Sequence, residues 1–200
     1  QGKQGLVCVL TDPIKADVLA AAPDLKVVSN IAVGYDNIDV AAAEARGIVV
    51  TNTPDVLTQA TAEMTWALIL AVTRRLGEGE RLVRRGSWQG WARAFMLGLE
   101  LGGQQLGIIG RGRIGRAVAA RAPAFGMKAV FAARESRSTP DLVEMSLDEL
   151  LVSSDVISIH TPLTPSTRHL IDKRALARMK RSAYLVNTAR GPVVDEEALA

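Results

Sequence analysis

Short, continuous apolar runs alternate with helical patterns along the whole chain. The runs predict strands at Leu6–Leu10, Lys26–Ser29, Ile48–Thr51, Gln105–Ile109, Met127–Ala133, Asp155–His160 and Ala183–Thr188. The segments between them predict helices at Ile14–Ala22, Val40–Arg46, Thr58–Arg84, Arg113–Phe125, Ser146–Ser153, Lys173–Lys180 and from Asp195 onward. Strands that are apolar at consecutive positions are typical of parallel sheets with both faces buried. The pattern therefore predicts a doubly wound α/β architecture.

The expected helix at Thr58–Arg84 is unusually long and separates the first three strand–helix units from the rest. It places a domain boundary near Leu57, with domains at residues 1–57 and 58–200. Both ends look cut: a polar Gln1-Gly2-Lys3 directly precedes a strand, and the chain stops at Ala200 within a helix. Four strands are expected after Leu57, whereas a dinucleotide fold has six. We therefore expect a fragment.

A glycine motif follows the strand at Gln105–Ile109. Gly110, Gly112 and Gly115 form G-x-G-x-x-G between an apolar strand and an alanine-rich helix. The first glycine permits a tight turn, the second lets the backbone approach a pyrophosphate, and the third lets helix and sheet pack closely. This context predicts a dinucleotide site rather than an ordinary glycine-rich turn.

The end of the next strand bears on the choice of cofactor. An NAD site usually places Asp or Glu there, to bind the ribose 2′-hydroxyl. This chain has Arg134, with Ser136 and Arg137 close behind. An arginine attracts a 2′-phosphate by charge and by its planar fork, which favours NADP. Glu135 keeps NAD open, because a shift of one residue would make it the ribose ligand.

Composition narrows the function classes. The net charge of +3 is mild and the arginines are scattered, so no nucleic-acid partner is expected. The longest apolar stretch, near residues 66–72, is too short to span a membrane and runs into Arg74-Arg75. The single cysteine, Cys8, lies in an apolar run and is expected to be an inert core residue in a reducing compartment. With no signal peptide at the start, we expect a cytoplasmic protein.

Six segments in a fixed order resemble one known family. They are Ala32-Val33-Gly34-Tyr35-Asp36-Asn37-Ile38-Asp39, Arg46-Gly47-Ile48 with Asn52-Thr53-Pro54, Ala62-Glu63, the glycine motif, His160-Thr161-Pro162-Leu163-Thr164, and Val186-Asn187-Thr188-Ala189-Arg190-Gly191. Together they resemble the D-isomer-specific 2-hydroxyacid dehydrogenases, in particular the glyoxylate/hydroxypyruvate reductase branch. The resemblance implies a Rossmann NAD(P)-binding domain at residues 58–200 and part of a smaller, flavodoxin-like substrate domain at residues 1–57.

The resemblance also implies roles for individual residues. The backbone amides of Val33 and Gly34 would hold the substrate carboxylate. Arg190 would be catalytic, binding both the carboxylate and the reacting carbonyl of a small 2-oxo acid. The implied cofactor-binding residues are Gly110, Arg111, Gly112, Arg113, Ile114, Gly115, Arg134, Arg137, Pro162, Thr188 and Ala189. No metal is implied. Asp36 and Asn37 fit the motif as turn-forming residues.

Arg190 also stands out by its chemistry. It follows a buried strand at the edge where open α/β sheets bind ligands. A guanidinium suits a 2-oxo acid, because it pairs with the carboxylate and stabilises charge developing on the carbonyl. Gly191-Pro192 is expected to bend the chain and point the fork inward. The plainer alternative is a surface arginine in a turn.

The family's proton donor does not match a residue of this chain. The resemblance implies a histidine supported by a glutamate, both C-terminal to the arginine. His160 and His169 precede it, and Glu196 and Glu197 are read as helix N-terminal charges. His160 is expected to be structural or near the cofactor, and His169 to be partly buried packing. We therefore expect residues 1–200 alone to show negligible turnover.

For the parent protein, the resemblance implies reduction of glyoxylate or hydroxypyruvate with NADPH. Another D-2-hydroxyacid dehydrogenase, of phosphoglycerate or D-lactate type, remains open, as does a dinucleotide-sensing corepressor on the same fold. The resemblance also implies a homodimer, formed through the long helix and the segment after it. Trp88, Trp91, Phe95 and Met96 in that segment suit interface anchors or an intrachain core.

Overall fold

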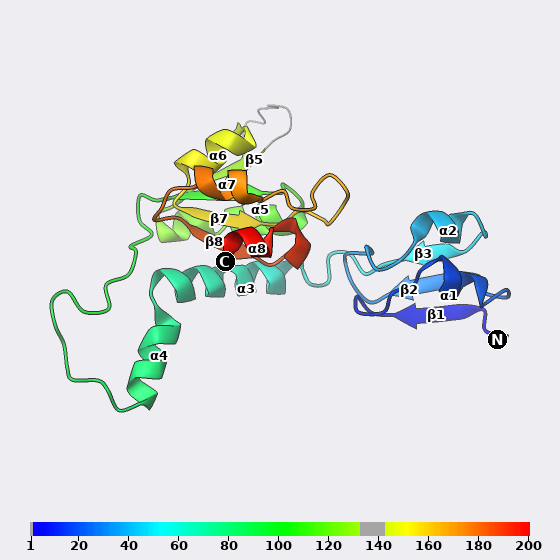
Figure 1. The fold of residues 1–200 in the computed structure, drawn as a ribbon, viewed down its shortest axis with the longest axis horizontal. Helices are drawn as coiled ribbons and strands as arrows, with labels where there is room; N and C mark the ends of the chain where they lie inside the picture. Colours follow the sequence, from blue (N-terminus) through cyan, green and yellow to red (C-terminus); the bar gives the residue numbers. More distant parts are fainter. Residues whose placement is uncertain (1, 133–142) are drawn as a thin grey trace. The chain divides into compact units, whose positions relative to one another are not determined.

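The computed structural model describes residues 2–132 and 143–200, which fall into two compact units, Gln1–Thr58 and Gln59–Ala200. Each unit is built on a parallel sheet (Figure 1). This confirms the α/β fold expected from the alternating pattern.

The first unit is a three-stranded sheet in the order β1-β2-β3. Its elements are β1 (Gly5–Cys8), α1 (Ala16–Ala20), β2 (Val27–Asn30), α2 (Val40–Glu44) and β3 (Val49–Thr51). One face carries Cys8 and Val28, which pack against Leu19 of α1 and Ala43 of α2. The thiol of Cys8 is buried, donates to Asn30 Oδ1, and has its pKa raised mainly by burial.

The second unit is a five-stranded parallel sheet in the order β6-β5-β4-β7-β8. Its elements are α3 (Thr58–Thr73), α4 (Leu76–Arg84), β4 (Gln105–Ile109), α5 (Arg113–Ala119), η1 (Ala122–Phe125), β5 (Lys128–Ala132), β6 (Glu144–Met145), α6 (Leu147–Ser153), β7 (Val156–Ile159), α7 (Lys173–Arg178), β8 (Tyr184–Asn187), η2 (Gly191–Val193) and α8 (Glu196–Leu199). The chain builds outward from β4 to β6 and then crosses to β7. The order therefore reverses between β4 and β7, where doubly wound sheets bind their ligands.

Helices cover both faces of this sheet. Leu106 and Ile108 point to one face and pack with Trp66 of α3 and Val118 of α5. Ile157 points to the other face, in the core that contains residues of α6 and α7. In Figure 1, α6 and α7 lie on one side of the sheet and α3 on the other. The continuous apolarity of the strands thus results from burial on two faces.

The prediction of one long helix at Thr58–Arg84 is wrong, because the segment forms two helices, α3 and α4. Arg75 takes a left-handed φ of 56° between α3 and α4. The break has a tertiary cause: the backbone N–H of Leu99 donates to the carbonyl of Thr73 at 2.8 Å. Gly98 also packs so closely there that a Cβ would overlap the Thr73 carbonyl oxygen. The chain thus returns onto the end of α3.

Other elements differ in extent. The helix expected at Arg113–Phe125 is α5 followed by the separate 3₁₀ turn η1, which contains Pro123. Among the described residues the second unit has five strands rather than four, because the two-residue β6 pairs with β5. The strand β6 was not predicted, because two residues are too few to show the hydrophobic pattern of a strand. Residue 133, expected to end the fifth strand, lies outside the described residues.

No helix in residues 2–132 or 143–200 is long and apolar enough to cross a bilayer. Within the same ranges, no group of three or more His, Cys, Asp or Glu side chains is placed to hold a metal ion.

Candidate functional site

The carboxyl ends of three neighbouring strands bring the site segments of the second unit together. Ile109 of β4 is paired with Ile159 of β7, which in turn is paired with Asn187 of β8. The residues that follow are the glycine loop, the turn at residues 160–162 and the turn at residues 188–190. Because the strands are parallel and in register, these three segments emerge at one edge, on both sides of the point where the strand order reverses.

The first and third glycines of the motif are required by close backbone contacts. Gly110 has a φ of 108°, and a Cβ on it would overlap the carbonyl of His160. A Cβ on Gly115 would overlap the carbonyl oxygen of Gly110. Only hydrogen fits at either position, so these glycines bring the strand, the loop and α5 together.

The second glycine is different, and it tests whether the loop fits a dinucleotide. Gly112 precedes α5 with ordinary extended dihedrals, φ −67° and ψ −173°. A Cβ on Gly112 would meet no atom within 4 Å. Nothing in the fold therefore demands glycine there, whereas a pyrophosphate approaching the backbone does. The loop fits the group, with the backbone of residues 112–114 as the surface that would receive it.

Arg190 lies in a turn that one side chain holds in shape. Asn187, the last residue of β8, donates from Nδ2 to the carbonyl of Arg190 at 2.8 Å and accepts from the N–H of Ala189 at 2.9 Å. Its amide thus clamps both ends of the turn after β8. The half-buried Arg190 donates from Nη1 to the carbonyl of Ala189, and the 3₁₀ turn with Pro192 follows. Asn187 is a residue whose role the sequence did not reveal.

A polar chain lies beneath this turn. Ser158 Oγ is 2.8 Å from His160 Nε2, and His160 Nδ1 is 3.4 Å from Thr188 Oγ1. Thr188 Oγ1 is 3.0 Å from Thr65 Oγ1, and Thr65 donates to the carbonyl of Thr61 at 2.8 Å. Ser158, His160 and Thr188 share the α3 side of the sheet because strand side chains alternate. Ser158 could have been found as a hydroxyl in an otherwise apolar strand.

The proton positions in this series of hydrogen bonds follow from its last acceptor, the carbonyl of Thr61. A carbonyl only accepts, so the Thr65 hydroxyl gives its proton to Thr61 and accepts from Thr188. Thr188 then accepts from His160 Nδ1–H, and His160 Nε2 accepts from Ser158. This arrangement requires a neutral imidazole, and burial accordingly lowers the pKa of His160 to about 4. His160 therefore fixes the Thr188 hydroxyl toward α3.

The neutral His160 predicts a pH-dependent stability. In the unfolded chain the imidazole takes a proton near its ordinary pKa of 6.5, whereas the folded form resists protonation down to about 4. Acidification therefore favours unfolding, and stability falls as the pH drops through 6.5 toward 4. Between pH 8 and pH 5 the loss is about 2 kcal/mol, to be measured by urea unfolding.

His160→Gln is the matched control and should flatten this slope. Asp155 does not interfere, because hydrogen bonds from Gln105 and Lys180 lower its pKa below the ordinary 3.8 against the opposing effect of burial. Its contribution is lost only in stronger acid. An equal slope in wild type and His160→Gln would contradict the assignment.

In the first unit, the loop with Val33 and Gly34 is fixed by side chains around it. Asn52 Nδ2 donates to the carbonyl of Val33 at 2.9 Å, and the N–H of Thr53 donates to the carbonyl of Ala32 at 2.9 Å. In a trans peptide the N–H points opposite to the preceding carbonyl. The N–H groups of Val33 and Gly34 therefore point away from residues 52 and 53, which is the arrangement an anion needs.

A second amide pair supports the same loop. Asn30 donates to the carbonyl of Gly34 at 2.8 Å and to Asn37 Oδ1 at 3.1 Å. Asn37 donates to the carbonyls of Val9 and Asp12. Asn37 is thus buried and joins three segments, beyond the turn-forming role expected for it. The supporting roles of Asn30 and Asn52 were not predicted from the sequence.

The remaining expected residues have different outcomes. Arg134 and Arg137 lie outside the described residues. Pro162 is exposed after β7, and its carbonyl accepts from Thr167 Oγ1 at 2.6 Å. His169 is not partly buried packing: its side chain is 43% exposed and lies 4.0 Å from Asp195. A left-handed φ of 51° turns the chain there.

Comparison with known proteins gives consistent matches. The family model for the NAD binding domain of D-isomer specific 2-hydroxyacid dehydrogenases matches residues 66–200. A glyoxylate reductase of Thermofilum pendens is 50% identical over 203 residues, covering 98% of this chain and 60% of the relative. The chain thus spans 60% of that relative's length.

Solved structures agree. The D-lactate dehydrogenase of Aquifex aeolicus, complexed with NAD and lactic acid, has a TM-score of 0.92 and 38% identity, covering 99% of this chain and 60% of that chain. An acyclic imino acid reductase in complex with NADPH and D-Arg has a TM-score of 0.91 and 32% identity, covering 98% of this chain and 63% of that chain. The glycine loop, the clamped arginine turn and these matches lead to one conclusion: the chain belongs to the D-isomer specific 2-hydroxyacid dehydrogenase family, and residues 66–200 match its NAD-binding domain.

Proposed function

We propose that the protein containing this chain reduces glyoxylate and hydroxypyruvate to glycolate and D-glycerate, with NADPH as the reductant. The observation that carries the proposal is the Arg190 turn, clamped by Asn187 at the same sheet edge as the glycine loop. The 50% identity to a glyoxylate reductase supports the choice of substrate.

The residues of this chain have separable tasks in that reaction. The reduced nicotinamide, when bound, supplies the hydride. The backbone of residues 112–114 receives the pyrophosphate, while Thr188 and Ala189 line the nicotinamide, with the Thr188 hydroxyl held toward Thr65. Arg190 pairs with the substrate carboxylate and stabilises the negative charge that develops on the carbonyl oxygen. The N–H groups of Val33 and Gly34 bind the carboxylate.

The proton donor is not assigned to either histidine of this chain. His160 is neutral and has both ring nitrogens engaged, one with Ser158 and the other with Thr188. His169 lies beside Asp195. Glu196 and Glu197 occupy the first turn of α8, where acidic side chains are favoured.

The choice of NADPH over NADH rests on Arg134 and Arg137, whose positive charges suit a 2′-phosphate. NAD remains the alternative, because Glu135 could bind the ribose hydroxyls instead. The proposed domain roles are substrate binding for residues 1–57 and nucleotide binding for residues 58–200. The proposed setting is the cytoplasm, with no nucleic-acid or membrane partner.

The test is turnover by the full-length protein. We expect glyoxylate and hydroxypyruvate to be reduced with NADPH at a higher kcat/KM than pyruvate or phosphohydroxypyruvate. Preference for pyruvate would indicate a D-lactate type and preference for phosphohydroxypyruvate a phosphoglycerate type. NADPH binding without turnover of any 2-oxo acid would instead favour a dinucleotide-sensing protein.

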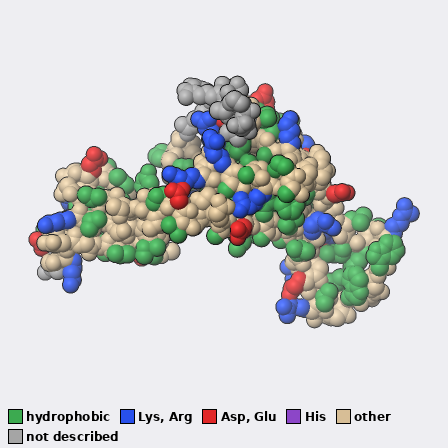
Figure 2. All heavy atoms as spheres, turned by 180° about the vertical axis from the view of Figure 1, so that it is seen from behind, with side chains coloured by type: hydrophobic (Ala, Val, Ile, Leu, Met, Phe, Trp, Pro, Cys, Tyr) green, Lys and Arg blue, Asp and Glu red, His purple; other side chains and the backbone are tan. Residues whose placement is uncertain are grey.

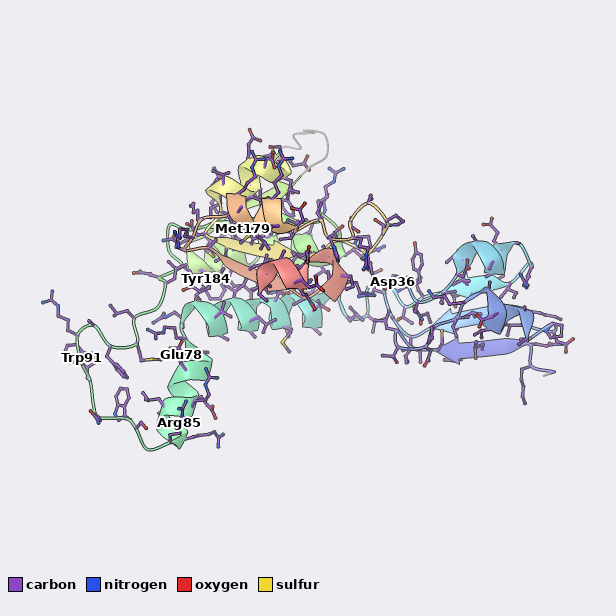
Figure 3. All side chains as sticks on the ribbon, viewed as in Figure 1. Asp36, Glu78, Arg85, Trp91, Met179 and Tyr184 are labelled. Carbon is purple, nitrogen blue, oxygen red and sulfur yellow. The ribbon has the colours of Figure 1, made fainter. Side chains whose placement is uncertain are left out.

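We also propose a homodimer formed through the arm, defined as residues 76–98. Trp91 is 84% exposed and Val83 63% exposed, and Figure 2 shows hydrophobic side chains gathered on this segment, at the lower right. The loop that carries Trp91 turns back beside α4 (Figure 3), with Arg75 Nη1 donating to the carbonyl of Leu97. Trp88 and Phe95 form a tilted ring pair at 5.9 Å.

Sedimentation of the full-length protein tests this interface. The wild type is expected to sediment as a dimer at micromolar concentration, because exposed aromatic side chains are typical interface anchors. The double change Trp88→Ser and Trp91→Ser should favour the monomer. A monomeric wild type would reject the arm as an interface.

A further inference from the structure

Arg111 places a large cation inside the glycine loop, at a position where the motif requires no particular side chain. Its Nη1 donates to Glu144 Oε1 at 3.0 Å. The Arg111 side chain is 46% exposed, whereas that of Glu144 is 1% exposed. The pair thus has a buried acidic member and a cation that faces solvent.

The strand order locates the guanidinium. Arg111 follows β4, Glu144 begins β6, and β5 lies between these two strands. Ile109 is paired with Ala132, and Phe131 with Glu144. To reach Glu144 from the β4 loop, the Arg111 side chain crosses the carboxyl end of β5. In dinucleotide folds the adenosine ribose lies at the end of this second strand.

The charges at this edge favour a phosphate over a ribose diol. An NAD site presents an accessible carboxylate to the ribose hydroxyls. The Glu144 carboxylate is almost fully buried and is engaged by Arg111, so it is not presented to a ligand. Of this pair, which belongs to the described residues, the accessible member is the Arg111 guanidinium, which carries several N–H donors in a planar fork suited to phosphate.

We infer that Arg111 is a specificity-determining residue that binds the 2′-phosphate of NADPH, and that Glu144 is the positioning residue that holds it over the end of β5. This inference deepens the proposed function and rests on its choice of NADPH. It assigns selectivity to the glycine loop itself, through Arg111 after β4 and Glu144 of β6, which lie far apart in the sequence.

The experiment measures dissociation constants of the full-length protein for NADPH and NADH, and for the fragments 2′,5′-ADP and 5′-AMP. Arg111→Met keeps the apolar stem and removes the charge. It should weaken binding of NADPH and 2′,5′-ADP by about 10- to 100-fold, with NADH and 5′-AMP changed less than about twofold, because only the phosphate contact is lost. Arg111→Lys should recover part of the loss.

Two further variants keep the result interpretable. Arg111→Met removes the ion pair between Arg111 and the buried Glu144 carboxylate, so the double variant with Glu144→Gln removes both charges and should show the same loss of selectivity if the single variant does not fold. Arg178→Met is the matched control, since it breaks an ion pair with Asp148 elsewhere in the unit and should leave selectivity unchanged.

The outcomes separate this inference from the proposed function. The role of Arg111 would be overturned if Arg111→Met weakened the binding of NADPH and NADH equally. It would also be overturned if the wild type preferred NADPH and the variant kept the same ratio of the two dissociation constants. Either result would leave 2-oxo acid reduction intact. A wild type that fails to reduce glyoxylate would reject the proposed function, and the binding ratios of the fragments would still report on Arg111.

Discussion

Gly112→Ala is expected to weaken NAD(P)H binding by about tenfold or more without loss of stability. The backbone at Gly112 has dihedrals that alanine adopts freely, and a Cβ there would meet no atom within 4 Å. The methyl group would instead occupy the space through which a pyrophosphate reaches the backbone. Dissociation constants and thermal unfolding of the full-length protein measure the two effects separately.

Gly115→Ala should behave in the opposite way. The Cβ of the new alanine would overlap the backbone carbonyl of Gly110. A backbone carbonyl cannot move aside as the end of a flexible side chain can. The helix must move away from the loop, at a cost on the order of 3 kcal/mol in folding free energy. Binding should then be lost together with stability.

The control for both glycine variants is Gly102→Ala. The nearest atom to a Cβ there is Glu100 Oε1 at 3.9 Å, so neither stability nor binding should change. Wild-type binding by Gly112→Ala would contradict the pyrophosphate assignment. Wild-type stability of Gly115→Ala would contradict the described packing of loop and helix.

Arg190→Ala is expected to lower kcat/KM for glyoxylate by about 10³-fold or more in the full-length enzyme. The change removes both the ion pair with the substrate carboxylate and the donor to the developing alkoxide, so kcat should fall and KM should rise. Arg190→Lys should recover only part of the activity, because a point charge does not reproduce the planar fork. Steady-state kinetics measures both parameters.

Two measurements accompany the Arg190 variants. NADPH affinity should stay near that of wild type, because the pyrophosphate is received by the glycine loop on a different strand. Arg174→Ala, at an exposed arginine on α7, should leave kcat/KM unchanged. If Arg190→Ala retained turnover within tenfold of wild type, the arginine would not be the group that orients the substrate.

The stability and catalytic tests report on different parts of one edge. His160 and Asn187 are partly buried supports of the turn after β8, whereas Arg190 and Gly112 are the groups that would meet ligands. Changes at the supports are therefore expected to alter stability as well as kinetics, and changes at the contact groups to alter kinetics alone.

The sequence by itself determined the architecture, and it predicted which residues lie at the ligand-binding edge. Continuous apolar runs such as Leu106–Ile109 are read directly as buried parallel strands, because both faces of the sheet must be covered. The glycine motif marked its own loop, and one of its positions, Gly115, excludes a side chain for a local steric reason, the carbonyl of Gly110. Arg190 was predicted from the family resemblance, and its place after a strand that ends at the ligand-binding edge supported the prediction.

Only the tertiary structure decided the features that depend on residues far apart in the chain. The return of Gly98 and Leu99 onto Thr73 divides the long apolar helix, although local periodicity continues across the break. The pairing of β6 with β5 brings Glu144 within 3.0 Å of Arg111. This contact could not be predicted from the sequence, because a strand of two residues is too short to show a hydrophobic pattern. Thr65 meets Thr188 across 123 positions of sequence. Hydrophobic pattern is a local property, whereas a hydrogen bond between distant side chains exists only once the strand order is fixed.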